Sequence, residues 1–198
     1  MINKKKLDKI LNKVEKPARY IGMEQNSITK DLDKVKVKFA FCFPDIYDVG
    51  MSHLGLHILY NLINEVEDFV CERVFSPWID MEELMRKENI PLYTLENKEE
   101  VKNFDFLGFT LQYEMSYTNI LNILDLAEIP LLSKDRDDSH PLIIAGGPCA
   151  YNPEPLADFI DVFVLGEGEE VILELLNKYK EHKEKNWDKE LFLKDILS

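Results

Sequence analysis

The sequence predicts an α/β protein built on a doubly wound, mainly parallel sheet of five strands. Five short apolar runs have the length of β-strands, and amphipathic stretches with a helical period of apolar residues separate or follow them. Parallel strands need crossover connections, which are usually helices, so this alternation favours a parallel sheet with helices on both faces. No internal repeat or low-complexity tract competes with this interpretation.

The first three elements follow from the pattern of apolar residues. Residues 35–43 (VKVKFAFCF) begin with alternation and end in an apolar run, as does a strand that enters a buried parallel sheet. Residues 51–66 carry apolar side chains near the helical period, which predicts a helix. Residues 68–75 (DFVCERVF) are predicted to form the second strand.

The middle of the chain repeats this alternation. Residues 76–89 predict a helix with acidic residues in its first turn and with Ser76 or Asp80 at the N-cap position. Residues 104–111 (FDFLGFTL) predict the third strand, and residues 114–129 return to the helical period.

The last third of the chain adds two strands and a final helix. Residues 141–147 (PLIIAGG) and 161–167 (DVFVLGE) predict strands, and residues 168–184 predict the helix that follows. Residues 187–198 are amphipathic but lack a Gly or Pro terminator, so we expect this end to continue into a longer protein.

The composition restricts the function. The chain has 198 residues, 45% of them hydrophobic, with 24 Lys and Arg against 37 Asp and Glu, and its formal net charge is −13. A general nucleic-acid or anionic-membrane role is disfavoured, because both need a basic surface. The longest apolar runs are shorter than the roughly 18–20 residues of a membrane span, and no signal peptide is recognisable. The three isolated cysteines predict a reduced, cytoplasmic protein without disulfides or structural zinc.

The first 20 residues depart from this acidic composition. They hold two acidic residues and seven basic ones, namely Lys4, Lys5, Lys6, Lys9, Lys13, Lys16 and Arg19. We interpret residues 1–34 as a basic N-terminal arm whose lysines form a solvated helix face. A contact with RNA or with an acidic neighbour is the alternative interpretation of these lysines.

Four loops that follow predicted strands carry the candidate site residues. In an open parallel sheet, ligands bind beyond the carboxyl ends of the strands, so these loops are where a site is expected. The first loop is polar, the third strand ends in a hydroxyl and an amide, the fourth in two glycines, and the fifth in a Gly-rich turn that opens a helix. The candidates are Asp45, Tyr47, Asp48, Gly50, His53, Thr110, Gln112, Gly146, Gly147, Glu167 and Gly168.

Common nucleotide and metal motifs are missing at these positions. No GxGxxG follows the first strand, and no GxxxxGK[ST] occurs. A phosphoacceptor site of the receiver-domain kind would need an aspartate where this chain has Thr110. His53 and His57 are four residues apart, but without an HExxH glutamate or a third ligand they predict no metal site. Asp45 and Asp48 could act as an acid–base pair or could cap the helix that follows. The sequence therefore predicts a flavodoxin-like fold that lacks the motifs for nucleotide chemistry.

Three short motifs resemble those of cobalamin-binding domains. DIYDVG (45–50) resembles the first motif, DxHDxG, with tyrosine in place of the histidine. TLQ (110–112) resembles the second, SxL, with threonine for serine and glutamine for leucine. The glycine pair 146–147 matches the third. The order of the three motifs along the chain, and their positions at strand ends, support the resemblance more strongly than any one motif does alone.

Longer segments extend the resemblance to roughly residues 17–184. KPARYIGMEQNS, FPDIYDVGMSHLG, GGPCAYNPEPLADF and LGEGEE together are similar to the N-terminal domain of one branch of radical SAM proteins. The resemblance implies a cobalamin-binding-domain-like (Rossmann-like) fold over residues 35–184, with residues 185–198 starting a linker to a radical SAM barrel. It implies that this downstream domain is the partner of the chain and alone carries the [4Fe–4S] cluster and S-adenosylmethionine.

Two departures from the family pattern bear on the cofactor and on the activity of this chain. The family's histidine coordinates cobalt, and Tyr47 is a poor substitute because its phenol is protonated at neutral pH. Cys42, Cys71 and Cys149 cannot form the CxxxCxxC cluster motif, so we expect no cleavage of S-adenosylmethionine by this chain alone.

Two hypotheses about the function follow. Either the domain holds a corrinoid such as cobalamin, or an unknown substrate, next to the barrel, or it is a degenerate structural or interaction domain. In the second case it has no cofactor and could belong to an RNA-modifying radical SAM protein. His53 lies near the first loop, where it could approach a cofactor, and the resemblance places the segment at Glu167 and Gly168 near the cofactor edge.

Overall fold

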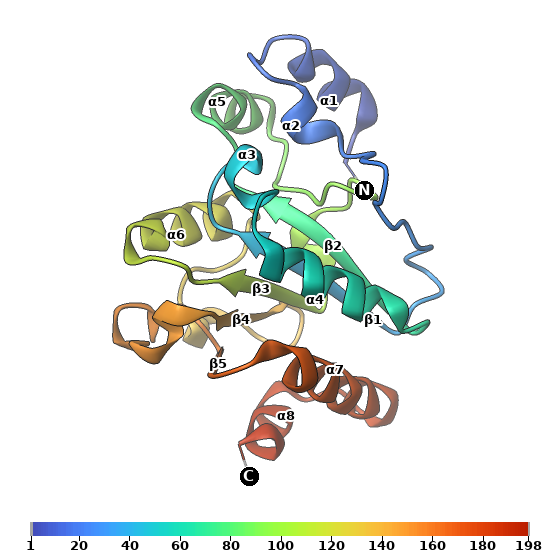
Figure 1. The fold of residues 1–198 in the computed structure, drawn as a ribbon, viewed down its shortest axis with the longest axis vertical. Helices are drawn as coiled ribbons and strands as arrows, with labels where there is room; N and C mark the ends of the chain where they lie inside the picture. Colours follow the sequence, from blue (N-terminus) through green and yellow to red (C-terminus); the bar gives the residue numbers. More distant parts are fainter. Residues whose placement is uncertain (1, 198) are drawn as a thin grey trace.

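The sheet of the computed structural model, which describes residues 2–197, has five parallel strands in the order β2-β1-β3-β4-β5. Figure 1 shows them in this order from top to bottom. The strands are β1 (Val37–Phe43), β2 (Phe69–Phe75), β3 (Phe106–Thr110), β4 (Leu142–Gly146) and β5 (Val162–Val164). The predicted parallel α/β fold is therefore confirmed, and the strand order is that of flavodoxin-like domains.

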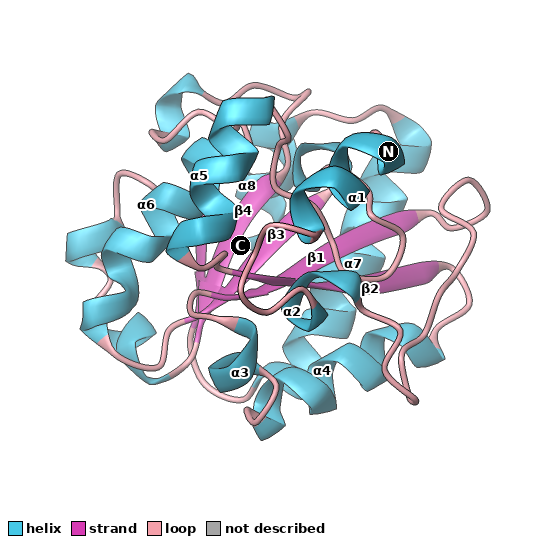
Figure 2. Cartoon of the chain, turned by 90° about the horizontal axis from the view of Figure 1, so that it is seen from above, coloured by secondary structure: helices cyan, strands magenta, loops and turns pink. Residues whose placement is uncertain are grey.

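Helices cover both faces of the sheet (Figure 2). They are α1 (Lys4–Leu11), α2 (Ala18–Ile21), α3 (Tyr47–Gly50), α4 (Leu54–Glu65), α5 (Ile79–Glu88), α6 (Tyr117–Leu126), α7 (Gly168–Lys185) and α8 (Lys189–Ile196). Short 3-10 turns complete the connections between them. Every strand and helix predicted from the sequence between residues 35 and 184 has a counterpart among these elements.

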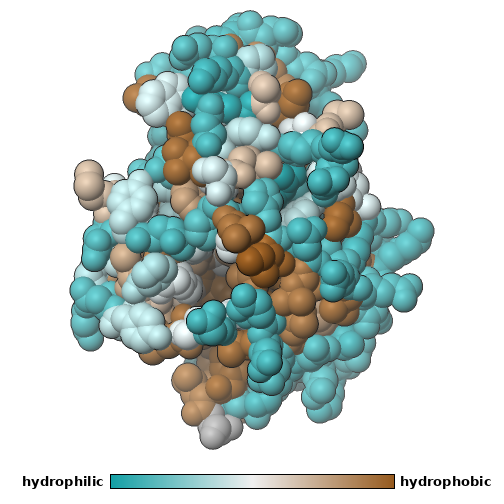
Figure 3. All heavy atoms as spheres, viewed as in Figure 1, coloured by the Kyte–Doolittle hydropathy of each residue, from teal (hydrophilic) through white to brown (hydrophobic). Residues whose placement is uncertain are grey.

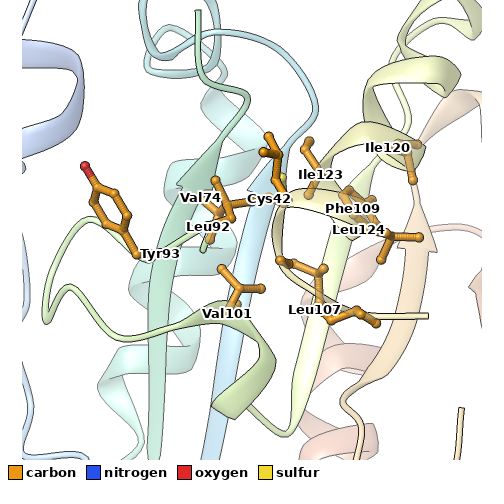
Figure 4. Close-up of a cluster of buried hydrophobic side chains, with 14 of the residues drawn as sticks. Cys42, Val74, Leu92, Tyr93, Val101, Leu107, Phe109, Ile120, Ile123 and Leu124 are labelled. Carbon is orange, nitrogen blue, oxygen red and sulfur yellow. The ribbon is translucent and has the colours of Figure 1, made fainter. Parts of the chain in front are cut away.

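Two hydrophobic clusters hold the layers together. On one face, α1, α5 and α6 pack against strand residues such as Cys42, Leu107 and Phe109 (Figure 4). On the other face, α4, α7 and α8 pack against Phe39 and Phe106, among others. The alternation of side chains along buried strands explains this division, because neighbours in a strand point to opposite faces. Each fully buried large apolar side chain contributes about 1.5–3 kcal/mol.

The N-terminal segment packs onto the domain. The apolar side of α1, with Leu7 and Ile10, is buried against the cluster that contains α5. Lysines of α1 lie on the exposed side, where Lys9 pairs with Glu88. The basic residues therefore form the outer face of a docked helix.

The C-terminal segment also contributes to the core. Phe192 of α8 is fully buried against Tyr179 of α7, with the rings at 90° and their centroids 5.5 Å apart. Asp188 caps α8 by accepting a hydrogen bond from the backbone N–H of Leu191. Lys189 pairs with the buried Asp161 at 3.0 Å, which ties α8 to the start of β5.

One predicted helix start is wrong. The helix expected to begin with Ser76 or Asp80 as its N-cap begins at Ile79, after Trp78, and has no side-chain cap. The Asp80 carboxylate instead accepts hydrogen bonds from the backbone N–H groups of Glu15 and Met81. A contact with a residue that is distant in sequence has thus replaced the local cap.

Candidate functional site

A cleft of about 290 Å³ opens over β1, β3 and β4, towards the carboxyl ends of the strands and on the face that α4 and α7 cover. Figure 3 shows a hollow with hydrophobic walls near the middle of this side of the molecule. The chain reverses its direction of strand addition between β1 and β3, and ligands of doubly wound sheets bind at this switch point. The cleft therefore lies where the topology places a binding site.

The floor of the cleft is apolar, and glycines make up much of the rest of its lining. Phe39 and Phe41 of β1 and Ile144 of β4 line it. The wall glycines are Gly55, Gly108, Gly146, Gly147, Gly166 and Gly168. At Gly147, which directly follows β4, φ is 105°, a positive value that favours glycine. The cleft is thus shaped for a flat, largely apolar group.

Three polar side chains form a connected chain along the cleft. The backbone N–H of Leu56 donates to Nδ1 of His53 over 3.0 Å, so His53 is the N-cap of α4. The His53 ring is hydrogen-bonded to the Gln112 side chain. Nε2 of Gln112 donates to Oγ1 of Thr110 over 2.7 Å. Burial lowers the pKa of His53, which keeps its ring neutral at physiological pH.

The rim of the cleft is acidic at the start of α7. Glu167 occupies the N-cap position of α7 without a capping bond from its side chain, and Gly168 is the first helical residue. Glu167 and Glu169 line the opening, and both are exposed. Carboxylates at a helix N-terminus interact favourably with the helix dipole, so the helix itself accounts for acidic residues at this place.

The structure brings together seven of the predicted site residues. The residues that line the cleft are His53, Thr110, Gln112, Gly146, Gly147, Glu167 and Gly168. The other four, Asp45, Tyr47, Asp48 and Gly50, lie outside its lining. Apart from His53, the predicted residues that line the cleft come from the ends of β3 and β4 and from the segments that follow β3, β4 and β5.

Tyr47 is occupied by the N-terminal segment. Its hydroxyl donates to Glu24 over 2.7 Å, and its ring packs edge-on against Phe75 with the centroids 5.4 Å apart. Burial, reinforced by the Glu24 carboxylate, raises the pKa of Tyr47 to about 12. Its phenol therefore stays protonated and does not line the cleft.

The neighbours of Tyr47 are also engaged. Asp48 pairs with Arg19 at 2.5 Å, and this pairing lowers the pKa of Asp48. Asp45 accepts a hydrogen bond from the Tyr113 hydroxyl over 2.7 Å. Neither aspartate caps α4, so of the two interpretations of these residues the capping one is wrong, and His53 caps the helix instead.

Gly50 has a packing role. A Cβ at this position would collide with the Phe75 ring and touch Cβ of Phe43. The glycine of the first motif therefore lets α3 approach the ends of β1 and β2.

A buried ionic network beside this loop was not anticipated from the sequence. The Arg73 guanidinium pairs at 2.6 Å with Glu24 and at 2.6 Å with Glu96. It also lies over the Tyr60 ring. Glu72 is fully buried next to it and accepts a hydrogen bond from Thr94. The sequence signal was a Glu-Arg pair inside an otherwise apolar strand, which requires partners when buried.

The two residues of the cleft floor, Phe39 and Phe41, are also absent from the site residues predicted from the sequence. Alternation along residues 35–43 would have placed Phe39 and Phe41 on one face of the strand. It could not have shown that this part of the face stays uncovered, because that depends on how far α4 and α7 lie apart.

Metal and membrane features are limited in the described part of the chain. Among residues 2–197, no group of three or more His, Cys, Asp or Glu side chains is placed to hold a metal ion. Within the same residues, every helix is too short or too polar to cross a bilayer.

Two comparisons with known proteins found similar sequences. A family model described as "Radical SAM proteins, N-terminal" matches residues 55–198. An uncharacterized protein of Methanocaldococcus jannaschii is 31% identical over 169 residues, which make up 79% of this chain and 32% of that protein. The chain thus spans about a third of the length of this curated relative. Because the family model covers well over half of its residues, the chain belongs to the N-terminal domain family of radical SAM proteins.

Proposed function

We propose that this domain holds a corrinoid such as cobalamin for a radical SAM domain that follows it in a longer protein. The carrying observation is the cleft over β1, β3 and β4, which has an aromatic floor and glycine walls. A corrinoid combines a large ring with a nucleotide tail that ends in a flat base. The cleft is near the lower end of the roughly 300–1,000 Å³ range of ligand pockets, so it fits the tail and not the corrin ring.

The residues of the cleft fit a tail better than they fit a cobalt ligand. Gly146 leaves room for a flat ring to approach the backbone, and Thr110 and Gln112 offer polar contacts. Nδ1 of His53 is engaged by the backbone of Leu56, and Tyr47 faces Glu24. We therefore propose that the domain holds the corrinoid without a protein ligand to cobalt. A bound corrinoid would supply methyl-transfer or radical chemistry at cobalt.

The partner we propose is the downstream radical SAM domain of the same polypeptide. The segments that follow the strands at the carboxyl edge of the sheet expose large apolar side chains, including Leu54, Met115, Tyr151 and Leu165. Apolar side chains gathered at a ligand-binding edge are typical of surfaces that another domain covers. A corrinoid held there would lie between the two domains.

Retention of hydroxocobalamin tests the proposal. The purified chain is mixed with hydroxocobalamin at tens of micromolar and passed over a gel-filtration column, and the corrin absorbance is followed. We expect the absorbance to elute with the protein. Elution of the corrinoid entirely apart from the protein would contradict the proposal.

A matched pair of variants locates the binding. A Cβ at Gly146 would meet Val164 only at ordinary contact distances of 3.5 and 3.7 Å. Gly146→Leu should therefore fold while its side chain fills the cleft beside Ile144. Glu170→Leu adds the same side chain to the exposed surface of α7, outside the cleft lining. We expect loss of retention in the first variant and unchanged retention in the second; equal retention would place the corrinoid elsewhere.

A further inference from the structure

We propose that the outer side of α1 and the start of α5 form a binding surface for single-stranded nucleic acid. This surface, the basic strip, consists of Lys4, Lys5, Lys9, Lys13, Lys16, Arg19 and Trp78. It lies on the face of the sheet opposite to the cleft, because α1 and α5 pack on one face, whereas α4 and α7 pack on the other. A ligand of the basic strip would therefore leave the cleft free.

The basic strip runs along α5, which packs beside α1 (Figure 1). At the end of α5, Lys6 donates to the backbone oxygen of Glu88 over 3.1 Å, and Lys9 pairs with the Glu88 carboxylate at 3.6 Å. At the start of α5, the backbone N–H of Glu15 donates to Asp80 over 2.7 Å. Residues 6–15 therefore lie antiparallel to α5, and the strip is about 15 Å long, the length of this helix of 10 residues.

The fold uses little of the charge on the basic strip. Lys4, Lys5 and Lys13 form no ion pair with any residue between 2 and 197. Lys9 and Lys16 each pair with one carboxylate, at 3.6 and 3.5 Å, and their side chains are more than half exposed. Like charges four residues apart in a helix, such as those of Lys5 and Lys9, repel each other. A bound anion would relieve this repulsion.

The basic strip belongs to an otherwise acidic chain. The first 20 residues carry a net charge of +5, whereas the remaining residues sum to −18. The two acidic residues of this segment, Asp8 and Glu15, lie among the lysines. Because an acidic surface repels polyanions, this distribution of charge directs a polyanion to the basic strip.

An exposed aromatic side chain lies at the end of the basic strip. The Arg19 guanidinium lies over the Trp78 ring, 5.6 Å from the ring centroid, and is held there by its ion pair with Asp48. Trp78 remains 42% exposed, and Ile79 beside it is 64% exposed. Proteins that bind single strands combine basic residues for the backbone with aromatic rings on which unpaired bases stack. Lysines that end at a stacking ring therefore favour a single-stranded nucleic acid over a duplex or an acidic protein.

The length of the basic strip sets the size of the site. At about 3.4 Å per phosphate of one strand, about 15 Å accommodates about four phosphates. Each phosphate that is neutralised on a single strand contributes about 0.7 to the slope of log K against log salt concentration. We therefore expect the logarithm of the binding constant to fall with a slope of about −3.

Binding of a labelled oligouridine tests the proposal. The probe has about 12 nucleotides, within the range of known site sizes, and its bases are unpaired. Fluorescence anisotropy with the full chain gives dissociation constants between about 50 and about 200 mM salt. We expect a micromolar dissociation constant at the lower salt concentration and the slope stated above.

A triple variant and a matched control test the lysines. Replacement of Lys5, Lys9 and Lys13 by Gln removes three exposed charges and keeps good helix formers, so α1 should stay folded. The salt slope should then fall to about −1. The control makes the same three replacements at exposed lysines outside α1 and α5, namely Lys134, Lys185 and Lys194. It changes the net charge equally and should keep the slope of the wild type.

Variants of Trp78 test the stacking ring. Trp78→Leu should weaken oligouridine binding about tenfold, the effect of losing one base–aromatic stack, while the salt slope stays the same because no charge is removed. Trp78→Phe keeps a ring and should recover most of the affinity. Thermal unfolding followed by circular dichroism shows that both variants are folded at the temperature of the titrations.

Several results would overturn the proposal. These are no binding of oligouridine at about 50 mM salt, equal binding of poly-glutamate or of a duplex RNA, and equal losses in the two triple variants. Unchanged affinity in Trp78→Leu would overturn it as well, because the surface would then attract any polyanion. Retention of hydroxocobalamin by the same variants reports on the cleft separately, so failure of the basic strip and failure of the proposed function are distinguishable.

Discussion

The carboxyl edge of the sheet is divided into a closed half and an open half. Over β1 and β2, the loop that contains Tyr47 and Asp48 is bound to Arg19 and Glu24 of the N-terminal segment. Over β3 and β4, the ends of the strands face the cleft. Both halves carry motifs that resemble those of one cofactor-binding family. The difference teaches that the residues of a motif at a strand end stay available to a ligand only where no other part of the chain covers them.

The largest loss of stability is expected when the buried ion pairs of the closed half are broken. In Arg73→Leu, the side chain of Glu96 would remain fully buried without its cation. Removing one partner of a buried pair destabilises by about 3–5 kcal/mol. Urea unfolding followed by circular dichroism measures this loss.

An exposed arginine serves as the control for Arg73. Arg86→Leu breaks pairs with Asp125 and Glu82, but the arginine is about half exposed, so the variant should cost only about 1 kcal/mol. Similar losses in the two variants would show that the closed half is not held by its buried charges.

Much of the fold could be predicted because buried parallel strands are recognisable as apolar runs. Residues 35–43 and 104–111 contain β1 and β3, since both faces of these strands are covered. Thr110 and the pair Gly146–Gly147 were placed in the cleft by the same reasoning, because the ends of parallel strands meet at one edge.

The contacts that close the first half could not be predicted from the sequence. Whether Asp48 faces a ligand or an arginine depends on a segment 29 residues away in sequence, whose docking no local pattern encodes. His53 was named as a site residue, but its role as the cap of α4 was missed because histidine is not among the preferred capping residues.

A steric test addresses the open half. A Cβ at Gly108 would collide with the Phe39 ring, so Gly108→Ala should cost about 1–3 kcal/mol through displacement of the cleft floor. At Gly168, a Cβ would approach Leu59 no closer than 3.4 Å, and Gly168→Ala should be nearly neutral. Urea midpoints compare the two; an unaffected Gly108→Ala would mean that the floor of the cleft is adaptable.

A smaller loss of stability is expected from changes at His53, where the two halves meet. Loss of the cap in His53→Ala should cost about 1 kcal/mol, whereas His53→Asn keeps a capping oxygen and should lose less. Unfolding in urea near neutral pH measures both values. Equal losses would show that the hydrogen bond to the N–H of Leu56 adds nothing to stability.

The pH dependence of stability provides an independent test of His53. Burial lowers its pKa from the ordinary value of 6.5, so the unfolded chain binds a proton more readily than the folded chain. The stability contribution is therefore complete above pH 6.5 and is lost as the pH falls through the lowered folded-state value. His53→Asn should remove this part of the pH dependence. A wild-type curve that coincides with that of the variant between neutral and mildly acidic pH would contradict the burial of a neutral imidazole.

The smallest loss of stability is expected from a change at Asp48, at the outer edge of the closed half. Asp48 is 42% exposed, and its pair with Arg19 is open to water, so Asp48→Asn should cost less than about 1 kcal/mol. The lowered pKa of Asp48 means that this stabilisation is present above pH 3.8 and is lost as the pH falls through the folded-state pKa. Acid unfolding of the wild type and of Asp48→Asn should therefore differ slightly near neutral pH and converge in acid. If Asp48→Asn instead lowered stability as much as Arg73→Leu, the N-terminal segment would be held by its surface pairs and not by the buried network, and the boundary between the two halves would have to be drawn at Asp48.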